Sequence, residues 1–184
     1  MKEAESTTPP ILRKEEVFTE FLGLTDVPTP RVAGTAGCKA NADTVIRLLN
    51  DALATEIICI LRYKRHYFMT VGISSRHVKA KFLQHATEER AHADQLVERI
   101  VQLGSKPDLP LERLLSRSHA EHVEGDSLME MMTADLIGER IAIETYRDMI
   151  SYVGADDQMT RQVLERILVQ EEEHAENLAG LLGD

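Results

Sequence analysis

The segment from Leu164 to Leu178, LERILVQEEEHAENL, places a glutamate three residues before a histidine inside a regular apolar repeat. The leucines of this segment recur at the spacing of one face of an α-helix. Residues three apart on a helix lie one turn above each other, so Glu171 and His174 share that apolar face. The segment therefore predicts a helix that carries a carboxylate and an imidazole on the face it buries.

The same pair occurs earlier, as Glu89 and His92 in the segment EERAHADQLVERIVQLG of residues 88–104. Its helical pattern extends over about 75–103 and ends before Gly104 and Pro107, two residues that stop helices. One such pair could arise by chance in a chain rich in glutamate. Two pairs, each in register with an apolar stripe, indicate that both contribute to the same buried site.

Two further helical patterns each contribute one acid to an otherwise apolar stripe. The first extends over about 43–71 and carries Glu56, and the other extends over about 126–153 and carries Glu139. Asp43 and Asp126 are suited to cap their N-termini. The separation from Glu56 to Glu89 nearly equals that from Glu139 to Glu171, so the two halves of the chain resemble each other. The last helix is expected over about 157–182.

The lengths of the links between these helices predict their topology. The first and third links are short, so each joins an antiparallel pair, whereas the middle link, about 104–125, can span the whole bundle. We therefore predict an all-α protein, a four-helix bundle with a long crossover between helices two and three. The bundle takes residues 41–184. Residues 1–40, rich in Pro and Gly, form a partly irregular N-terminal extension whose pattern allows a short helix near residues 15–22.

Composition restricts the class of protein. The net charge is −10, and the charges of residues 1–40 nearly cancel, so no basic tail for DNA is expected. The chain has no apolar run long enough to span a membrane and no apolar core of a secretory signal near its start, which predicts a cytoplasmic protein. Cys38 and Cys59 are expected to be unpaired thiols, with Cys59 in helix packing rather than a metal site.

Four glutamates in four apolar seams would cost much free energy if they were buried without a cation. Two divalent metal ions shared by four carboxylates and two imidazoles supply that compensation. A ligand set without thiolate favours iron or manganese over structural zinc. The predicted ligands are Glu56, Glu89, His92, Glu139, Glu171 and His174.

The positions of several neighbouring residues on the helices predict other roles for them. Tyr63 is placed to donate a hydrogen bond to a ligand carboxylate. His85, one turn before Glu89, could contact a ligand or simply be partly buried, and we favour partial burial. Glu88, together with Glu172 and Glu173, is expected to be exposed charge beside the ligands.

Four segments of this sequence resemble bacterioferritins and the Dps-like branch of the ferritin superfamily. They are NDALATEIICILRY, EERAHADQLVERIVQLG, LIGERIAIETYRDMI and LERILVQEEEHAENL. The resemblance implies that the six predicted ligands form a ferroxidase centre holding two iron ions per subunit. Manganese is the alternative metal. It also implies a homo-oligomer that uses Fe(II) with peroxide or dioxygen as substrates.

The sequence departs from these relatives in three places. Arg90, followed by Ala91, stands where bacterioferritin carries its haem-binding methionine, so haem is not expected. The sequence ends ten residues after His174, without a fifth helix, which favours a 12-subunit shell over larger cages, with a dimer as the runner-up. The cysteine pair of some Dps-like proteins is also missing, since Ile141 follows Glu139 by two residues.

The resemblance and the ligand set lead us to expect a ferroxidase that stores or detoxifies iron and protects against oxidative stress. One alternative is a rubrerythrin-like peroxidase or a manganese catalase, neither of which stores mineral. Rubrerythrins place a further acid where this chain has Ala142. The other alternative is a metal-free helical interaction module.

Overall fold

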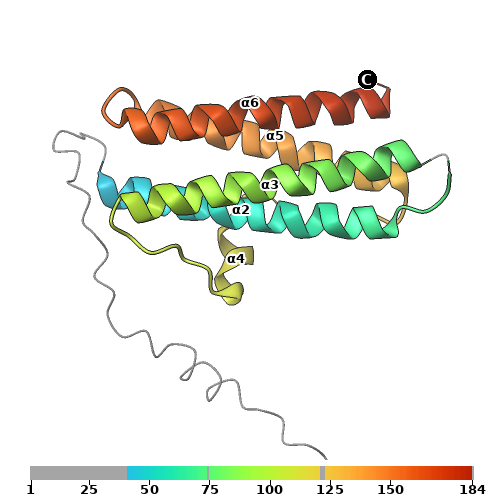
Figure 1. Cartoon of the computed structure of the whole chain (residues 1–184), viewed down its shortest axis with the longest axis horizontal. Helices are drawn as coiled ribbons and strands as arrows, with labels where there is room; N and C mark the ends of the chain where they lie inside the picture. Colours follow the sequence, from blue (N-terminus) through green and yellow to red (C-terminus); the bar gives the residue numbers. More distant parts are fainter. Residues whose placement is uncertain (1–40, 74, 121–122, 184) are drawn as a thin grey trace, which may run out of the picture. The chain divides into compact units, whose positions relative to one another are not determined.

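The computed structural model describes residues 41–73, 75–120 and 123–183. Four long helices lie side by side and a short one packs beside them (Figure 1). Their bounds are α2 Ala42–Met69, α3 Arg76–Gln102, α4 Leu111–Arg117, α5 Leu128–Val153 and α6 Gln158–Leu182. The expectations for residues 1–40, including the short helix near 15–22 and the thiol of Cys38, fall outside the described residues. Within the described ranges, no helix is long and apolar enough to cross a membrane.

Contacts between the helices establish their directions. Tyr63 on α2 reaches Glu139 on α5, while Tyr146, further along α5, reaches Glu56, earlier on α2, so these two helices are antiparallel. Glu88, early on α3, pairs with His174, late on α6, whereas Arg99, late on α3, pairs with Asp157 at the start of α6. These two helices are therefore also antiparallel. Because α5 and α6 form an antiparallel pair, α3 and α5 run in the same direction (Figure 1). The predicted four-helix bundle with a crossover between its second and third long helices is therefore confirmed.

The apolar core is divided into two clusters by a polar layer at mid-length. One cluster lies toward the start of α2 and is built around side chains such as Leu49, Leu96 and Leu164. The other lies toward the end of α2 and includes Phe82, Leu136 and Leu178. Glu56, Glu89, Glu139 and Glu171 fall between them, one on each long helix. The bundle thus holds its carboxylates at the greatest distance from both ends.

The predicted caps were displaced by one or two residues. Asn41, rather than Asp43, caps α2, and its side chain accepts a hydrogen bond from the Asp43 backbone N–H at 3.0 Å. Ser127, rather than Asp126, caps α5, because Glu130 three residues later completes a capping box with it. The prediction of Asp43 and Asp126 as caps was wrong, because in each case a residue one or two positions earlier or later accepts the backbone hydrogen bond instead.

The crossover contains the short helix α4, which the sequence pattern did not predict. α4 is too short to show an apolar period, and its only buried side chain is that of Leu114. The chain entering α4 is fixed at Asp108, whose backbone N–H donates to Asn50 Oδ1 at 2.7 Å and whose carboxylate accepts from Arg117 at 2.8 Å. These polar contacts hold the crossover along α2.

A buried ionic cluster ties α2 to α5 beside the polar layer. Asp135 accepts from Arg62 Nε at 2.7 Å and lies 2.8 Å from His66 Nδ1, and all three side chains are fully buried. Room for the guanidinium comes from Gly138, where an added Cβ would lie 2.2 Å from Arg62 Nη2. The glycine inside α5 is therefore required by the packing of a buried arginine.

We expect Gly138→Ala to lower the free energy of unfolding by about 2 kcal/mol, because the methyl group displaces a buried, paired guanidinium. Gly180→Ala is the matched control: it lies in α6 with nothing within 4 Å of its added Cβ. It should raise stability by about 0.5 kcal/mol, since alanine restricts the unfolded chain. Chemical denaturation of both variants measures the difference, and equal effects would contradict this account of Gly138.

Candidate metal centre

The polar layer brings together all six residues that the sequence predicted as ligands. They form two groups of four buried side chains, and within each group one ligand atom from each residue lies within 4.8 Å of the others. The first group is Glu56, Glu89, His92 and Glu171, and the second is Glu89, Glu139, Glu171 and His174. Glu89 and Glu171 belong to both groups. The geometry is therefore that of two neighbouring positions that share two carboxylates.

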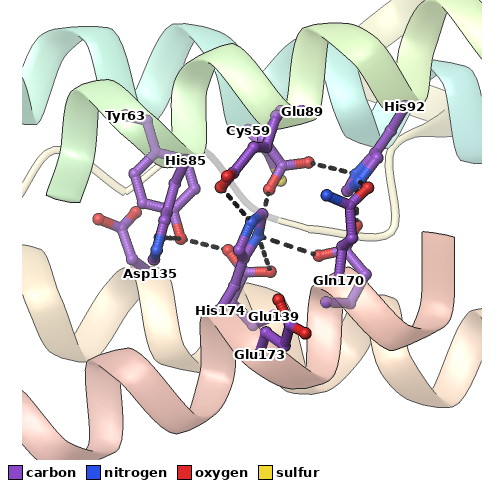
Figure 2. Close-up of polar contacts among 12 residues, drawn as sticks. Cys59, Tyr63, His85, Glu89, His92, Asp135, Glu139, Gln170, Glu173 and His174 are labelled. Atoms are coloured by element: carbon purple, nitrogen blue, oxygen red, sulfur yellow. Dashed lines mark hydrogen bonds and ion pairs between the residues drawn. The ribbon is translucent and has the colours of Figure 1, made fainter.

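Both histidines point the same ring nitrogen into the layer (Figure 2). His92 Nδ1 lies 3.0 Å from Glu171 Oε1, and His174 Nδ1 lies 3.2 Å from Glu89 Oε1. The other nitrogen of each ring is engaged outside the layer. His92 Nε2 lies 3.0 Å from Gln170 Oε1, and His174 Nε2 lies 2.9 Å from Glu88 Oε2. If a metal ion displaced the proton on Nδ1, the proton on Nε2 would be donated to these oxygens and the Nδ1 lone pair would be directed inward.

The inward-facing atoms contact one another as ion pairs but make no well-aligned hydrogen bond. They include one oxygen each of Glu56 and Glu89, both oxygens of Glu171, and Nδ1 of both histidines. Buried polar atoms without partners cost free energy, and carboxylates cost the most. A set of oxygen and imidazole donors converging on two points fits iron or manganese ions, which would satisfy all of these atoms together.

Two tyrosines hold the outer oxygens of the unshared glutamates. The Tyr63 hydroxyl donates to Glu139, as the sequence predicted for a ligand carboxylate, and the Tyr146 hydroxyl donates to Glu56. Tyr146 was missed as a partner of the site, although a signal was present. It follows Glu139 by seven residues, as Tyr63 follows Glu56, so the resemblance between the two halves could have revealed it.

Two neighbours of the site were assigned wrongly from the sequence. His85 is fully buried rather than partly buried, its ring stacks on that of His174 at 4.1 Å, and its Nδ1 lies 3.2 Å from the Tyr63 hydroxyl. Burial, with the nearby His174, lowers the pKa of His85 to about 4, so this ring is neutral at pH 7. Glu88, expected to be exposed, is half-buried and pairs with His174. Gln170 was not considered, because its side chain lies beside rather than on the apolar stripe.

The remaining expectations for this region agree with the structure. Cys59 is a free, buried thiol, and it belongs to neither group of converging side chains within the described residues. Glu173 is exposed, and Glu172 pairs with Arg147 at the surface.

The carboxylates of the layer compete for protons. Burial, reinforced by the charge of Glu89, raises the pKa of Glu56 to about 8. Burial and the charge of Glu139 raise the pKa of Glu171 to about 8 as well. Burial lowers the pKa of His92 and His174, but the surrounding carboxylates outweigh it and raise both pKa values far above their usual range. Without metal, the layer therefore retains protons at neutral pH.

Comparison with known proteins gives consistent relatives. The sequence model of the ferritin-like domain matches residues 46–184. A bacterioferritin from Brucella melitensis is 30% identical over 137 residues, 73% of this chain and 80% of that protein. The DNA protection during starvation protein 2 of Bacillus anthracis is 26% identical, covering 75% of this chain and 96% of that protein. Among solved structures, a dodecameric thioferritin, the bacterioferritin-related protein of Bacteroides fragilis, superimposes with a TM-score of 0.76 at 26% identity, over 79% of this chain and 88% of that one.

We expect the metal-free protein to lose stability as the pH rises from about 6.5 to about 8. Glu56, Glu171 and both histidines have raised pKa values in the folded state. Such groups stabilise the fold fully below their unfolded pKa values, and this contribution declines as the pH rises toward their folded ones. Added Co²⁺ should oppose the loss, because a cation replaces the protons. The melting temperature, measured with chelator and with Co²⁺ across this range, tests both statements, and a metal effect independent of pH would contradict them.

Proposed function

Because this chain belongs to the ferritin-like domain family, we propose that it is a ferroxidase, which oxidises Fe(II) at a di-iron centre inside each subunit. The resemblance to bacterioferritins and Dps-like proteins seen in the sequence is confirmed by the relatives. The proposed ligands of the two iron ions are Glu56, Glu89, His92, Glu139, Glu171 and His174.

The observation that carries this proposal is the set of unpaired, buried donor atoms that face one another in the polar layer. Four carboxylates balance the charge of two divalent ions, so the loaded layer is neutral. In our proposal Glu89 and Glu171 bridge the two ions, because they belong to both groups. Glu56 and Glu139 each serve one ion, and His92 and His174 supply one nitrogen to each.

The residues prepare two Fe(II) substrates to react together. The shared carboxylates hold both ions beside one oxidant, so that peroxide receives one electron from each ion while its O–O bond breaks. Two protons complete the conversion of peroxide to water, and dioxygen is the alternative acceptor. Tyr63 and Tyr146 fix one oxygen each of Glu139 and Glu56, which leaves the opposite oxygen directed at the ion. Burial of the layer keeps bulk water away from the reacting pair.

We further propose that the oxidised iron is stored within a cytoplasmic, 12-subunit shell, so that free iron is limited. The bacterioferritin-related protein of similar fold is dodecameric. The surface of this chain also carries exposed apolar side chains, among them Phe68 at 69%, Leu111 at 76% and Leu115 at 67% exposure. Their positions near the end of α2 and on α4 provide apolar surface that contact between subunits would bury.

Substitution of a bridging residue tests the activity. Glu89→Gln should lower the rate of Fe(II) oxidation by at least about 100-fold, because one donor to both ions is weakened. Iron oxidation is followed by absorbance under peroxide and, separately, under dioxygen. Glu144→Gln, on the exposed side of α5, is the matched control and should oxidise iron as the parent does. Equal rates for parent and Glu89→Gln would rule out the di-iron centre.

Particle mass and iron content separate storage from the alternatives. The purified protein should have a mass about twelve times the 20.7 kDa of one chain, and it should retain oxidised iron in excess of two ions per chain. Light scattering with elemental analysis measures both. A dimer that decomposes peroxide without retaining iron would support a rubrerythrin-like peroxidase or a manganese catalase instead. If the thermal stability of the protein is the same with metal and with chelator, a metal-free helical interaction module is supported.

A further inference from the structure

The two Glu-x-x-His segments are each preceded by a residue that reaches across the bundle. Glu88 directly precedes Glu89 on α3, and it pairs with His174 on α6 at 2.9 Å. Gln170 directly precedes Glu171 on α6, and it contacts His92 on α3 at 3.0 Å. The two residues occupy equivalent places in the two halves of the molecule. One ends in a carboxylate and the other in a neutral amide.

We infer that this pair makes the two metal positions unequal. The His174 position, formed by Glu89, Glu139, Glu171 and His174, binds a divalent cation more tightly than the His92 position. The His92 position is formed by Glu56, Glu89, His92 and Glu171. This inference rests on the proposed di-metal centre and adds an order of filling to it.

The physical reason lies in the hydrogen bond on the far side of each imidazole. An imidazole that donates its Nε2–H to a carboxylate is a stronger Nδ1 donor than one that donates to an amide, because the negative charge draws the proton. The negative charge of the carboxylate also attracts the cation on the other side of the imidazole by Coulomb interaction. Glu88 is held for this role, since its other oxygen accepts from Gln84 Nε2 at 3.0 Å. Gln170 offers His92 a well-oriented oxygen but no charge.

The other parts of the two positions are closely matched. Each has one unshared glutamate bound by a tyrosine, and both use the same two shared carboxylates. A second difference is His85, which stacks on His174 at 4.1 Å and whose counterpart in the other half is the buried Ile167. Beyond this stacked ring, the two positions differ in the group on the far side of each imidazole, which is the carboxylate of Glu88 for His174 and the amide of Gln170 for His92.

Unequal positions give the reaction an order. The His174 position fills first and keeps its ion, while the His92 position fills second and releases its ion first. A cation held at one position also fixes the shared carboxylates for the next. On this proposal, iron at the His92 position exchanges with the surroundings more readily than iron at the His174 position.

Exchange of the two residues tests this inference. Crystals of the full chain are grown with less than one Co²⁺ per chain, and anomalous scattering at the cobalt edge gives the occupancy of each position. We expect the parent to show about tenfold more cobalt at the His174 position. Glu88→Gln should remove this preference, Gln170→Glu should also remove it by strengthening the other position, and the double exchange should reverse it.

Two controls separate the possible outcomes. Glu173→Gln removes a negative charge from an exposed neighbour of His174 and should leave the cobalt ratio unchanged. Stepwise calorimetric titration with Co²⁺ should give two ions per chain for the parent and for all exchanged variants. If the parent binds no cobalt in the layer, the proposed function itself fails. If two ions bind but the double exchange keeps the original preference, the inference is overturned and His85 becomes the source of the difference.

Discussion

The structure depends on a single electrostatic constraint: four carboxylates are buried in one layer, where water cannot solvate them. In an apolar medium a charge of this kind must be paired or neutralised, and the cost of failing exceeds the stability of a typical domain. Without a cation, protons neutralise part of this charge, because burial raises the pKa values of Glu56 and Glu171 to about 8. Two divalent cations, as proposed, would balance the charge of all four carboxylates. The helices, their register and their crossover serve to place these carboxylates opposite one another.

Around this layer, each polar group is restrained by a neighbour of matching chemistry. Tyrosines hold the unshared glutamates, and Glu88 and Gln170 hold the two imidazoles from outside. On one side the layer adjoins a buried cluster in which Asp135 accepts from Arg62 and contacts His66. Such restraint holds the proposed ligands in place without a bound ion. Ion binding would then cost little conformational entropy of the side chains.

Much of this was accessible from the sequence, because helical periodicity is a strong signal over long segments. The register of Glu56, Glu89, Glu139 and Glu171 with apolar stripes predicted both the bundle and the layer, and the length of the middle link predicted the crossover. The predictions that were wrong or missing concern contacts that an apolar stripe does not reveal. Asn41 and Ser127 cap α2 and α5, and α4 is too short to show an apolar period. Glu88 and Gln170 lie at the edge of their apolar stripes. Their importance is visible only when α3 and α6 are placed side by side.

The division of the core into two apolar clusters by one polar layer has an evolutionary consequence. The cluster around Leu49 and the cluster around Phe82 each contact the layer through one tyrosine hydroxyl and are otherwise apolar. Replacing buried ionic groups with apolar ones of similar volume is often neutral or stabilising. A descendant that exchanged the six polar residues for leucine and methionine would therefore keep its architecture while losing its chemistry. Shape and chemistry are therefore separable in this architecture, because the two apolar clusters carry the packing and the layer carries the donor atoms.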